Sequence, residues 1–156
     1  MNPIVLYYSK SGTTQKFADR ICDDFGCKQI FIEPKEAYGN YIASICRVAN
    51  ERKAHIVPAF ITEIPNLQEY DTIFLGFPVW YSDIPAFVAA FVRRCDLRGK
   101  TVIPFTTFGG KGMKWSKDPL KEICSGARIC HPFESGMLKK ADYNAWISKI
   151  KHDFGG

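Results

Sequence analysis

Short apolar runs alternate with amphipathic stretches along most of the chain. The runs that predict strands are residues 4–8, 29–32, 72–77, 102–106 and the weaker run 128–130. The first and third runs are continuously apolar, which is typical of strands buried on both faces of a parallel sheet. Strands that alternate with helices through right-handed crossovers predict an α/β fold with helices on both faces of that sheet.

The stretches between the runs carry apolar residues at helical spacing. These predicted helices cover residues 17–25, 41–49, 84–92 and 146–154. Asp118-Pro119 has the form of an N-cap followed by proline at the first helical position, which predicts a further helix from Pro119. Asp83 is placed to cap the helix over 84–92. Residues 54–70 do not fit the alternation, and we interpret them as a covering loop.

The loop after the first run is rich in hydrogen-bond donors. Ligands of a doubly wound sheet bind outside the carboxyl ends of the strands, where the strand order reverses. Ser9-Lys10-Ser11-Gly12-Thr13-Thr14 holds four hydroxyls and one glycine at that position. Gly12 lets the backbone turn, and N–H groups at a helix N-terminus attract anions. The segment predicts a cradle for a terminal phosphate, with a plain Ser/Thr-rich N-cap region as the alternative.

This first loop differs from two common phosphate-binding motifs. A Walker loop would end in Gly-Lys-Ser or Gly-Lys-Thr, and that ending is missing. A dinucleotide fingerprint would need three glycines. The loop therefore favours a single phosphate group at the end of a ligand.

The loops after the third and fourth runs supply aromatic side chains and backbone freedom. Trp80 and Tyr81 occupy positions where a loop is normally polar, and they are able to stack on a flat ring. Packing against the following helix is the alternative for both aromatics. The candidate ligand-binding residues in these two loops are Pro78, Val79, Trp80, Tyr81, Ser82, Thr107, Phe108, Gly109, Gly110 and Gly112.

The three loops together describe a pocket with an anion hole and aromatic walls. Flavin mononucleotide (FMN) has matching features, because it combines one phosphate, a ribityl chain and a large flat ring system. The flavin would carry the chemistry, so we predict no catalytic side chain and no bound metal.

Three ordered motifs resemble the flavodoxin family. Ser9, Ser11, Gly12 and Thr14 fill the form Ser/Thr-x-Ser/Thr-Gly-x-Thr. Residues 76–80 read Gly-x-Pro-x-Trp, and residues 105–110 read Phe-x-Thr-x-Gly-Gly, as in a bacterial flavodoxin-like branch. The similarity covers nearly the whole chain, so residues 1–156 are expected to form one domain of the short-chain type.

The resemblance implies a fold, a cofactor and a function. The fold is a three-layer, doubly wound, five-stranded parallel sheet in the order 2-1-3-4-5. FMN would lie at the switch point between the first and third strands, a placement for which flavodoxin itself is the usual example. Residues 9–14 would hold the phosphate, and residues 78–82 and 107–112 would flank the isoalloxazine ring. The implied function is electron transfer through bound FMN between redox partner proteins.

Two features depart from that family pattern. Tyr81-Ser82-Asp83 contains no glycine, so a peptide flip that moves a residue to positive φ would be strained. We therefore expect a less stable one-electron flavin state. Lys111 and Lys114 lie on or just after the third loop, and cations there would favour the anionic reduced flavin and raise its two-electron potential.

The net charge of the chain and its distribution indicate which kinds of partner the protein is able to bind. The chain has 21 basic and 16 acidic residues, for a net charge of +5. Residues 93–121 hold eight Lys or Arg against two Asp, which gives this segment +6. A basic rim would select a redox partner with an acidic surface. Basic helices with interleaved aromatics are missing, so we predict no nucleic-acid binding.

An enzyme on the same fold is the alternative to a carrier. The weakened one-electron state and the basic segment are both compatible with an NAD(P)H-dependent quinone, nitro or flavin reductase. A receiver domain would need a phospho-acceptor aspartate after the third strand, where Phe77-Pro78 stands. A low-molecular-weight phosphatase would need a cysteine where Ser9 stands. Both of these fold relatives are disfavoured.

The amino-acid composition and the cysteine spacing indicate the class of protein and its cellular compartment. The 156 residues are 46% hydrophobic and 24% charged, which is typical of a globular domain. The six cysteines form no Cys-x-x-Cys pair and are expected to be reduced, small apolar residues; their spacing gives no support to a redox pair. No membrane-length apolar run and no targeting segment is evident, which predicts a cytoplasmic protein.

Overall fold

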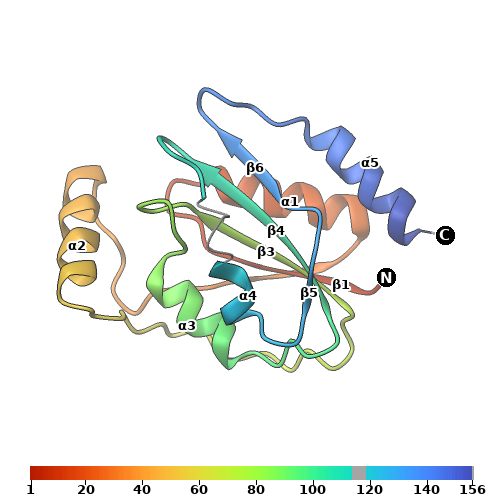
Figure 1. Ribbon diagram of the computed structural model, residues 1–156, viewed down its shortest axis with the longest axis horizontal. Helices are drawn as coiled ribbons and strands as arrows, with labels where there is room; N and C mark the ends of the chain where they lie inside the picture. Colours follow the sequence, from red (N-terminus) through yellow and green to blue (C-terminus); the bar gives the residue numbers. More distant parts are fainter. Residues whose placement is uncertain (114–118, 156) are drawn as a thin grey trace.

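A parallel β-sheet forms the centre of the protein. The computed structural model describes residues 1–113 and 119–155 (Figure 1). The strands are β1 (Pro3–Tyr7), β2 (Lys28–Phe31), β3 (Thr72–Pro78), β4 (Thr101–Phe108), β5 (Arg128–Ile129) and β6 (Phe133–Gly136). Their order is β2-β1-β3-β4-β5, and every pairing in this sheet is parallel. The predicted sheet order is therefore confirmed.

The fifth position of the sheet is divided between two short strands. Both β5 and β6 pair with β4, with Thr101 opposite Arg128 and Phe105 opposite Phe133. Between these two pairs, β4 advances by four residues (101 to 105), whereas the neighbouring chain advances by five (128 to 133). The extra residue in the neighbouring chain is the geometry of a β-bulge. His131 lies in the bulge at a φ of 50°. The sequence analysis missed β6 because its residues, Phe-Glu-Ser-Gly, form no apolar run.

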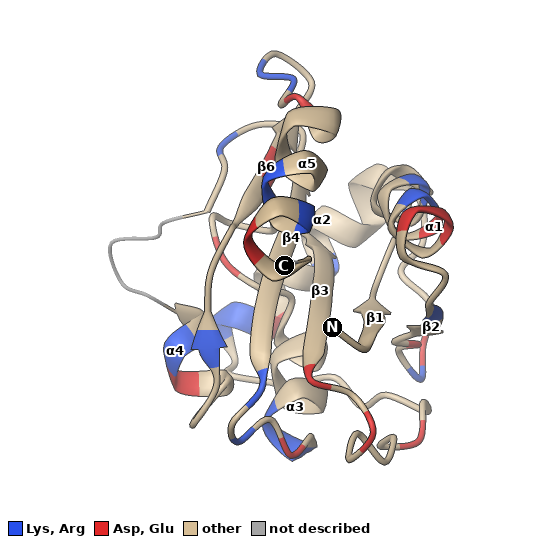
Figure 2. Cartoon of the chain, turned by 90° about the vertical axis from the view of Figure 1, so that its right-hand side faces the viewer, with Lys and Arg blue, Asp and Glu red and all other residues tan. Residues whose placement is uncertain are grey.

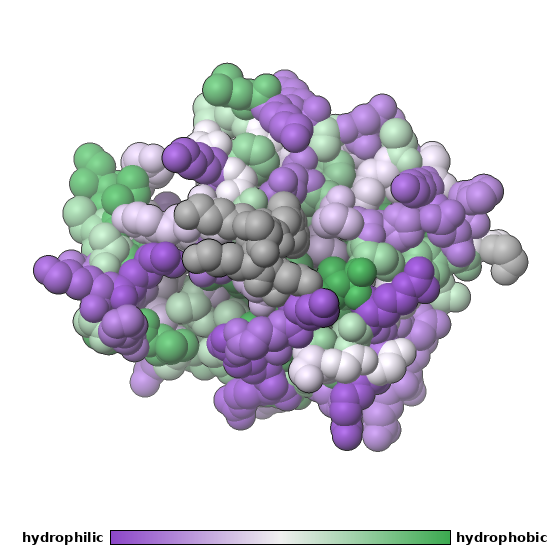
Figure 3. All heavy atoms as spheres, viewed as in Figure 1, coloured by the Kyte–Doolittle hydropathy of each residue, from purple (hydrophilic) through white to green (hydrophobic). Residues whose placement is uncertain are grey.

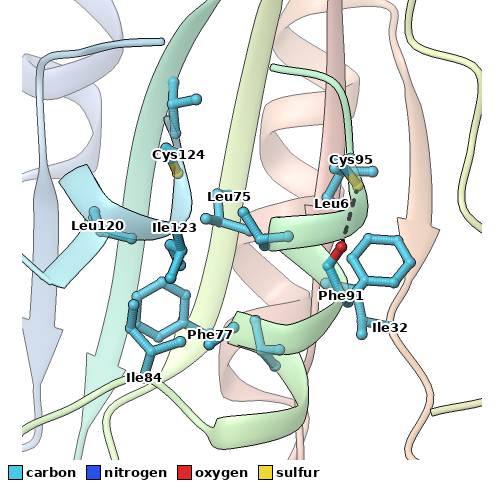
Figure 4. Packing of buried hydrophobic residues seen from close by; sticks show 14 of the residues in the cluster. Leu6, Ile32, Leu75, Phe77, Ile84, Phe91, Cys95, Leu120, Ile123 and Cys124 are labelled. Carbon is cyan, nitrogen blue, oxygen red and sulfur yellow. Dashed lines mark hydrogen bonds between the residues drawn. The ribbon is translucent and has the colours of Figure 1, made fainter. Parts of the chain in front are cut away.

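Helices cover both faces of the sheet. Their bounds are α1 (Thr13–Phe25), α2 (Tyr41–Lys53), α3 (Ala86–Arg94), α4 (Pro119–Ile123) and α5 (Tyr143–Phe154). On one face, Ile21 of α1 and Ile147 of α5 share a buried cluster with Phe74 of β3. Figure 4 shows the other face, where Phe77 of β3 packs among residues of α3 and α4. Burying each such side chain contributes about 1.5–3 kcal/mol.

Helix α2 stands apart from the sheet. Figure 1 shows it beside the edge at which the strands end. Its predicted apolar stripe is largely solvent-exposed, with Tyr41 75% and Ile45 41% accessible. The expected covering loop takes its place on the sheet face, because Leu67 is buried there and Phe60 packs on Phe91 of α3. Helical spacing therefore identified the helix but not the surface that it faces.

Helices α3 and α4 begin at Ala86 and Pro119, at or close to the predicted positions. Helix α3 begins at Ala86 with Pro85 at its N-cap, and Asp83 instead accepts a hydrogen bond from the Ile84 N–H at 2.8 Å. Asp83 therefore does not cap α3, because Ile84 and Pro85 separate it from the first helical residue. Helix α4 begins at Pro119 as predicted, and its proposed cap, Asp118, lies outside the described residues. In the described part of the chain, no helix has the length and apolar character needed to cross a membrane.

Gly76 of β3 leaves room for the ring of Phe105 on the neighbouring strand β4. A Cβ atom at this position would lie 2.1 Å from Cζ of Phe105. We expect Gly76→Ala to lower the free energy of unfolding by about 1–3 kcal/mol, because the buried Phe105 ring has little space to move. Gly109→Ala is the matched control, since its Cβ would meet no atom within 4 Å. Equal midpoints for both variants in urea unfolding would contradict this steric role.

Candidate functional site

A cavity of about 860 Å³ opens at the carboxyl ends of the strands. It lies where the loops after β1, β3 and β4 converge. The predicted residues that line it are Lys10, Ser11, Thr13, Pro78, Val79, Trp80, Tyr81, Thr107, Phe108, Gly109 and Gly110. The structure places the other predicted residues in the same loops but outside this lining: Ser9, Gly12, Thr14, Ser82 and Gly112. The topology thus brings the three predicted loops into one site.

The first turn of α1 presents open backbone donors. Its N-cap is Gly12, at a φ of 87°, and no described side chain caps the helix. The nearby hydroxyls have other partners: Ser9 Oγ accepts from the Gly12 N–H at 3.1 Å, and Ser11 lies 3.3 Å from the Thr13 hydroxyl. The alternative of a conventional side-chain cap is therefore not realised. The N–H groups of the first turn are thus left without a side-chain cap at the positive end of the helix dipole, as an anion site requires.

A buried hydrogen bond joins the first loop to the third. The Thr14 and Thr107 hydroxyls lie 2.7 Å apart, and both side chains are almost inaccessible to solvent. Thr14 belongs to the first turn of α1, and Thr107 lies near the end of β4. This contact fixes the spacing between the open amides of α1 and the glycine-rich segment after β4.

The loop after β3 forms a tight turn. Trp80 and Asp83 exchange two backbone hydrogen bonds of 3.0 Å each. The central residues Tyr81 and Ser82 both have positive φ, at 53° and 59°, as in a type I′ turn. Flipping the peptide between them would convert the turn to type II′, in which Tyr81 would keep a positive φ at a position that glycine normally occupies. The flip would therefore strain Tyr81, and the less stable one-electron state stays a prediction.

Aromatic packing holds Trp80 at the cavity wall. Its ring lies 4.8 Å from Tyr38 and 5.7 Å from Tyr8, in edge-to-face contacts. Burial raises the pKa of Tyr8 to about 12, so this phenol stays neutral near pH 7. Tyr81 is half exposed, with the Arg52 guanidinium 5.2 Å from its ring centre. Trp80 is therefore a fixed wall, whereas Tyr81 lies at the rim.

The glycine-rich loop after β4 has an anchor that the sequence analysis missed. Glu134 of β6 accepts a hydrogen bond from the Met113 N–H at 2.9 Å. Phe108 packs closely over Gly136, where a Cβ would lie 2.3 Å from the ring. Both contacts depend on β6 lying beside β4. Because β6 is short and largely polar, the sequence did not indicate that it lies beside β4.

Two further walls of the cavity come from segments outside the predicted loops. Helix α2 contributes Tyr41, Ser44, Ile45 and Val48. The segment 135–144, which joins β6 to α5, contributes the wall on another side. Figure 3 shows hydrophobic surface over α2 and at the tip of this connection, where Met137 and Leu138 are exposed. The apolar stripe over residues 41–49 was a usable signal, which the sequence analysis used only to predict a helix.

The positive charge of segment 93–121 is not gathered at the cavity. Arg93 and Lys100 lie at the opposite edge, where α3 ends and β4 begins (Figure 2). Arg93 pairs with Glu122 at 3.0 Å, which reduces its free charge. Lys111 does not line the cavity, and Lys114 lies outside the described residues. The described cations of segment 93–121 therefore do not gather into a single rim lining the cavity, and the acidic partner surface stays a prediction.

Other cations do line the cavity. They are Lys10, Arg20 and Lys140, and Asp142 is the acidic residue among the lining side chains. Asp142 is occupied as the N-cap of α5, where it accepts from the Ala145 N–H at 3.0 Å. Arg20 lies 3.7 Å from the Tyr143 ring centre. The cavity is thus mildly positive. Among the described residues, no group of three or more His, Cys, Asp and Glu side chains is placed to hold a metal ion.

The sheet order and the convergent loops define a doubly wound α/β protein with flavodoxin-like topology. The sequence model described as flavodoxin matches residues 2–150, and the chain belongs to the flavodoxin family. Among curated proteins, no sequence matches this chain.

Solved structures share the fold over almost their full length. A candidate flavoprotein from Bacteroides uniformis ATCC 8492 is 26% identical, with a TM-score of 0.80 over 96% of this chain and 97% of its own. A candidate flavoprotein from Bacteroides eggerthii DSM 20697 is 25% identical, with a TM-score of 0.78 over 97% and 96%. A flavoprotein in complex with FMN from Lactobacillus acidophilus NCFM is 18% identical, with a TM-score of 0.72 over 94% and 98%.

The hydroxyl pair that joins the loops is testable by a double-mutant cycle. We expect Thr14→Val to lower the free energy of unfolding by about 1–2 kcal/mol, because the buried Thr107 hydroxyl loses its partner. Thr107→Val should have a similar effect. The double variant should lose less than the sum, since neither site then holds an unpaired hydroxyl. Strict additivity in urea unfolding would show that the hydroxyls do not interact.

Proposed function

We propose that this protein binds FMN and transfers electrons through the bound flavin. The observation that carries the proposal is the first turn of α1, where backbone amides lie open beside hydroxyls at one end of a large cavity. A single terminal phosphate matches that donor set. The FMN complex of the Lactobacillus acidophilus relative supports the choice of cofactor.

The rest of the cavity suits the flavin ring. Trp80 and Phe108 present aromatic surface from two different loops, and the exposed backbone at Gly109 and Gly110 offers donors to the polar ring edge. Bound in this way, FMN supplies the redox chemistry. The protein residues bind the phosphate, orient the ring and limit the access of water.

The partner of such a carrier is expected to be a redox protein with an acidic surface. Lys10, Arg20 and Lys140 support this part of the proposal, because they leave the cavity mildly positive. Complementary charge mainly raises the rate of encounter and selects the partner. The cytoplasm remains the predicted location of this exchange.

An NAD(P)H-dependent reductase of quinones, nitro compounds or flavins is the second candidate function. The extension of the cavity to α2 and to segment 135–144 favours it, since those walls lie beyond the three flavin loops. A small substrate would have room to approach there. The same FMN site serves both functions.

FMN binding is tested by fluorescence titration of the apoprotein. We expect Gly12→Ala to weaken FMN binding by about tenfold or more, because a side chain at its φ of 87° would redirect amides that form charge-assisted hydrogen bonds. Gly99→Ala is the matched control, with a φ of 73° at the opposite edge of the sheet. We expect it to reduce stability alone. Failure of the wild-type protein to bind FMN at micromolar concentrations would refute the proposal.

Steady-state kinetics separate the two functions. As a carrier, the purified FMN-loaded protein should oxidise NAD(P)H very slowly with a quinone present, and addition of a flavodoxin reductase should restore electron flow. Rapid oxidation by the protein alone would instead identify a reductase. An anaerobic reductive titration of the same sample gives the yield of the one-electron state.

A further inference from the structure

Two cysteines touch each other at the end of α1 that is remote from the cavity. The Sγ atoms of Cys22 and Cys27 lie 3.7 Å apart and share a hydrogen bond. Both side chains are partly accessible to solvent. They lie near the last turn of α1, whereas the open amides occupy its first turn, roughly 15 Å away at 1.5 Å per residue. The pair is thus separate from the proposed FMN site.

The backbone imposes this contact. Helix α1 ends at Phe25, and Gly26 follows in the left-handed conformation, at a φ of 61°. The N–H groups of Gly26 and Cys27 both donate to the Cys22 carbonyl, the latter at 3.3 Å. In such a helix ending, the two residues that flank the turn commonly make an apolar contact. Here Cys22 and Cys27 occupy these two positions, so the backbone of the helix ending brings their thiols into contact.

We propose that Cys22 and Cys27 are a redox modification site that forms a reversible disulfide by exchange with a low-molecular-weight disulfide. One protein thiolate attacks the small disulfide, which forms a mixed disulfide and releases one small thiol. The second protein thiolate then attacks the bonded protein sulfur and releases the other small thiol. The two protein thiols are oxidised, and the small disulfide is reduced to two thiols.

The surroundings assign an order to the two attacks. In the structure the Cys27 thiol donates to Cys22 Sγ. Burial raises the pKa of Cys27, and a Cys27 thiolate would instead accept from the Cys22 thiol and from its own N–H, which partly offsets this rise. Burial raises the pKa of Cys22 to about 12, and Asp19 and Asp23 act in the same direction. Asp19 lies one helical turn before Cys22 on α1 and Asp23 directly follows it, so negative charge on the same helix disfavours a Cys22 thiolate. Cys27 is therefore the first nucleophile, and Cys22 resolves the mixed disulfide.

The other thiols provide internal comparisons. Cys46 lies exposed on α2, and Cys95 is buried with its Sγ directed to the Phe91 carbonyl at 3.5 Å. Cys46 should therefore form a persistent mixed disulfide, and Cys95 should remain reduced. The bond between Cys22 and Cys27 would join the last turn of α1 to the segment that enters β2.

The experiment is incubation of the native full-length protein with oxidised glutathione, followed by alkylation and tryptic mass mapping. Cleavage after Arg20 and Lys28 places both cysteines on the peptide 21–28. We expect this peptide to lose two hydrogen atoms and resist alkylation, while the Cys46 peptide carries glutathione. Dithiothreitol should reverse both changes, and the oxidised protein should melt roughly 5 °C higher.

Single variants test the assigned order. Cys22→Ser should leave a stable glutathione adduct on Cys27, whereas Cys27→Ser should leave Cys22 mostly reduced. Reversal of that pattern would overturn the order of attack. Glutathione adducts on both cysteines of the wild-type protein, or two free thiols after oxidation of Cys46, would overturn the site itself. FMN affinity should change less than twofold on oxidation, so this outcome is independent of the proposed function.

Discussion

The parallel register that joins β1, β3 and β4 is the constraint on which the cavity depends. Tyr7 of β1 lies opposite Gly76 of β3, which in turn lies opposite Phe105 of β4. Parallel strands that are level with one another deliver their following loops to the same edge of the sheet. The buried apolar side chains of β1 and β3 hold this register, because a shift by one residue would turn each side chain to the opposite face.

Backbone groups, more than charged side chains, give the proposed phosphate site its character. The first turn of α1 offers N–H donors whose position is fixed by the helix, and the Thr14–Thr107 hydrogen bond ties that turn to β4. Fixed dipoles require little rearrangement when an anion binds. Lys10, Arg20 and Lys140 add a modest positive field around this site.

The two ends of α1 use left-handed glycines for opposite purposes. Gly12 begins the helix and leaves donors open toward the cavity, whereas Gly26 closes the helix by satisfying its terminal carbonyls. The closed end also presses Cys22 against Cys27. One helix therefore connects the proposed cofactor site to a second, chemically distinct site through rigid backbone geometry.

Local patterns in the sequence predicted five of the six strands and the three loops that meet at the cavity, and the family resemblance predicted the strand order. Apolar runs report burial directly, and Gly12 reports a turn, because both effects act within a few residues. Tertiary structure alone decided that α2 faces the cavity, that Glu134 anchors the third loop and that the described cations of segment 93–121 do not line the cavity. These outcomes depend on which segments, distant in the sequence, pack next to each other. The periodicity of one segment shows that it has an apolar side, but it does not show which other segment packs against that side.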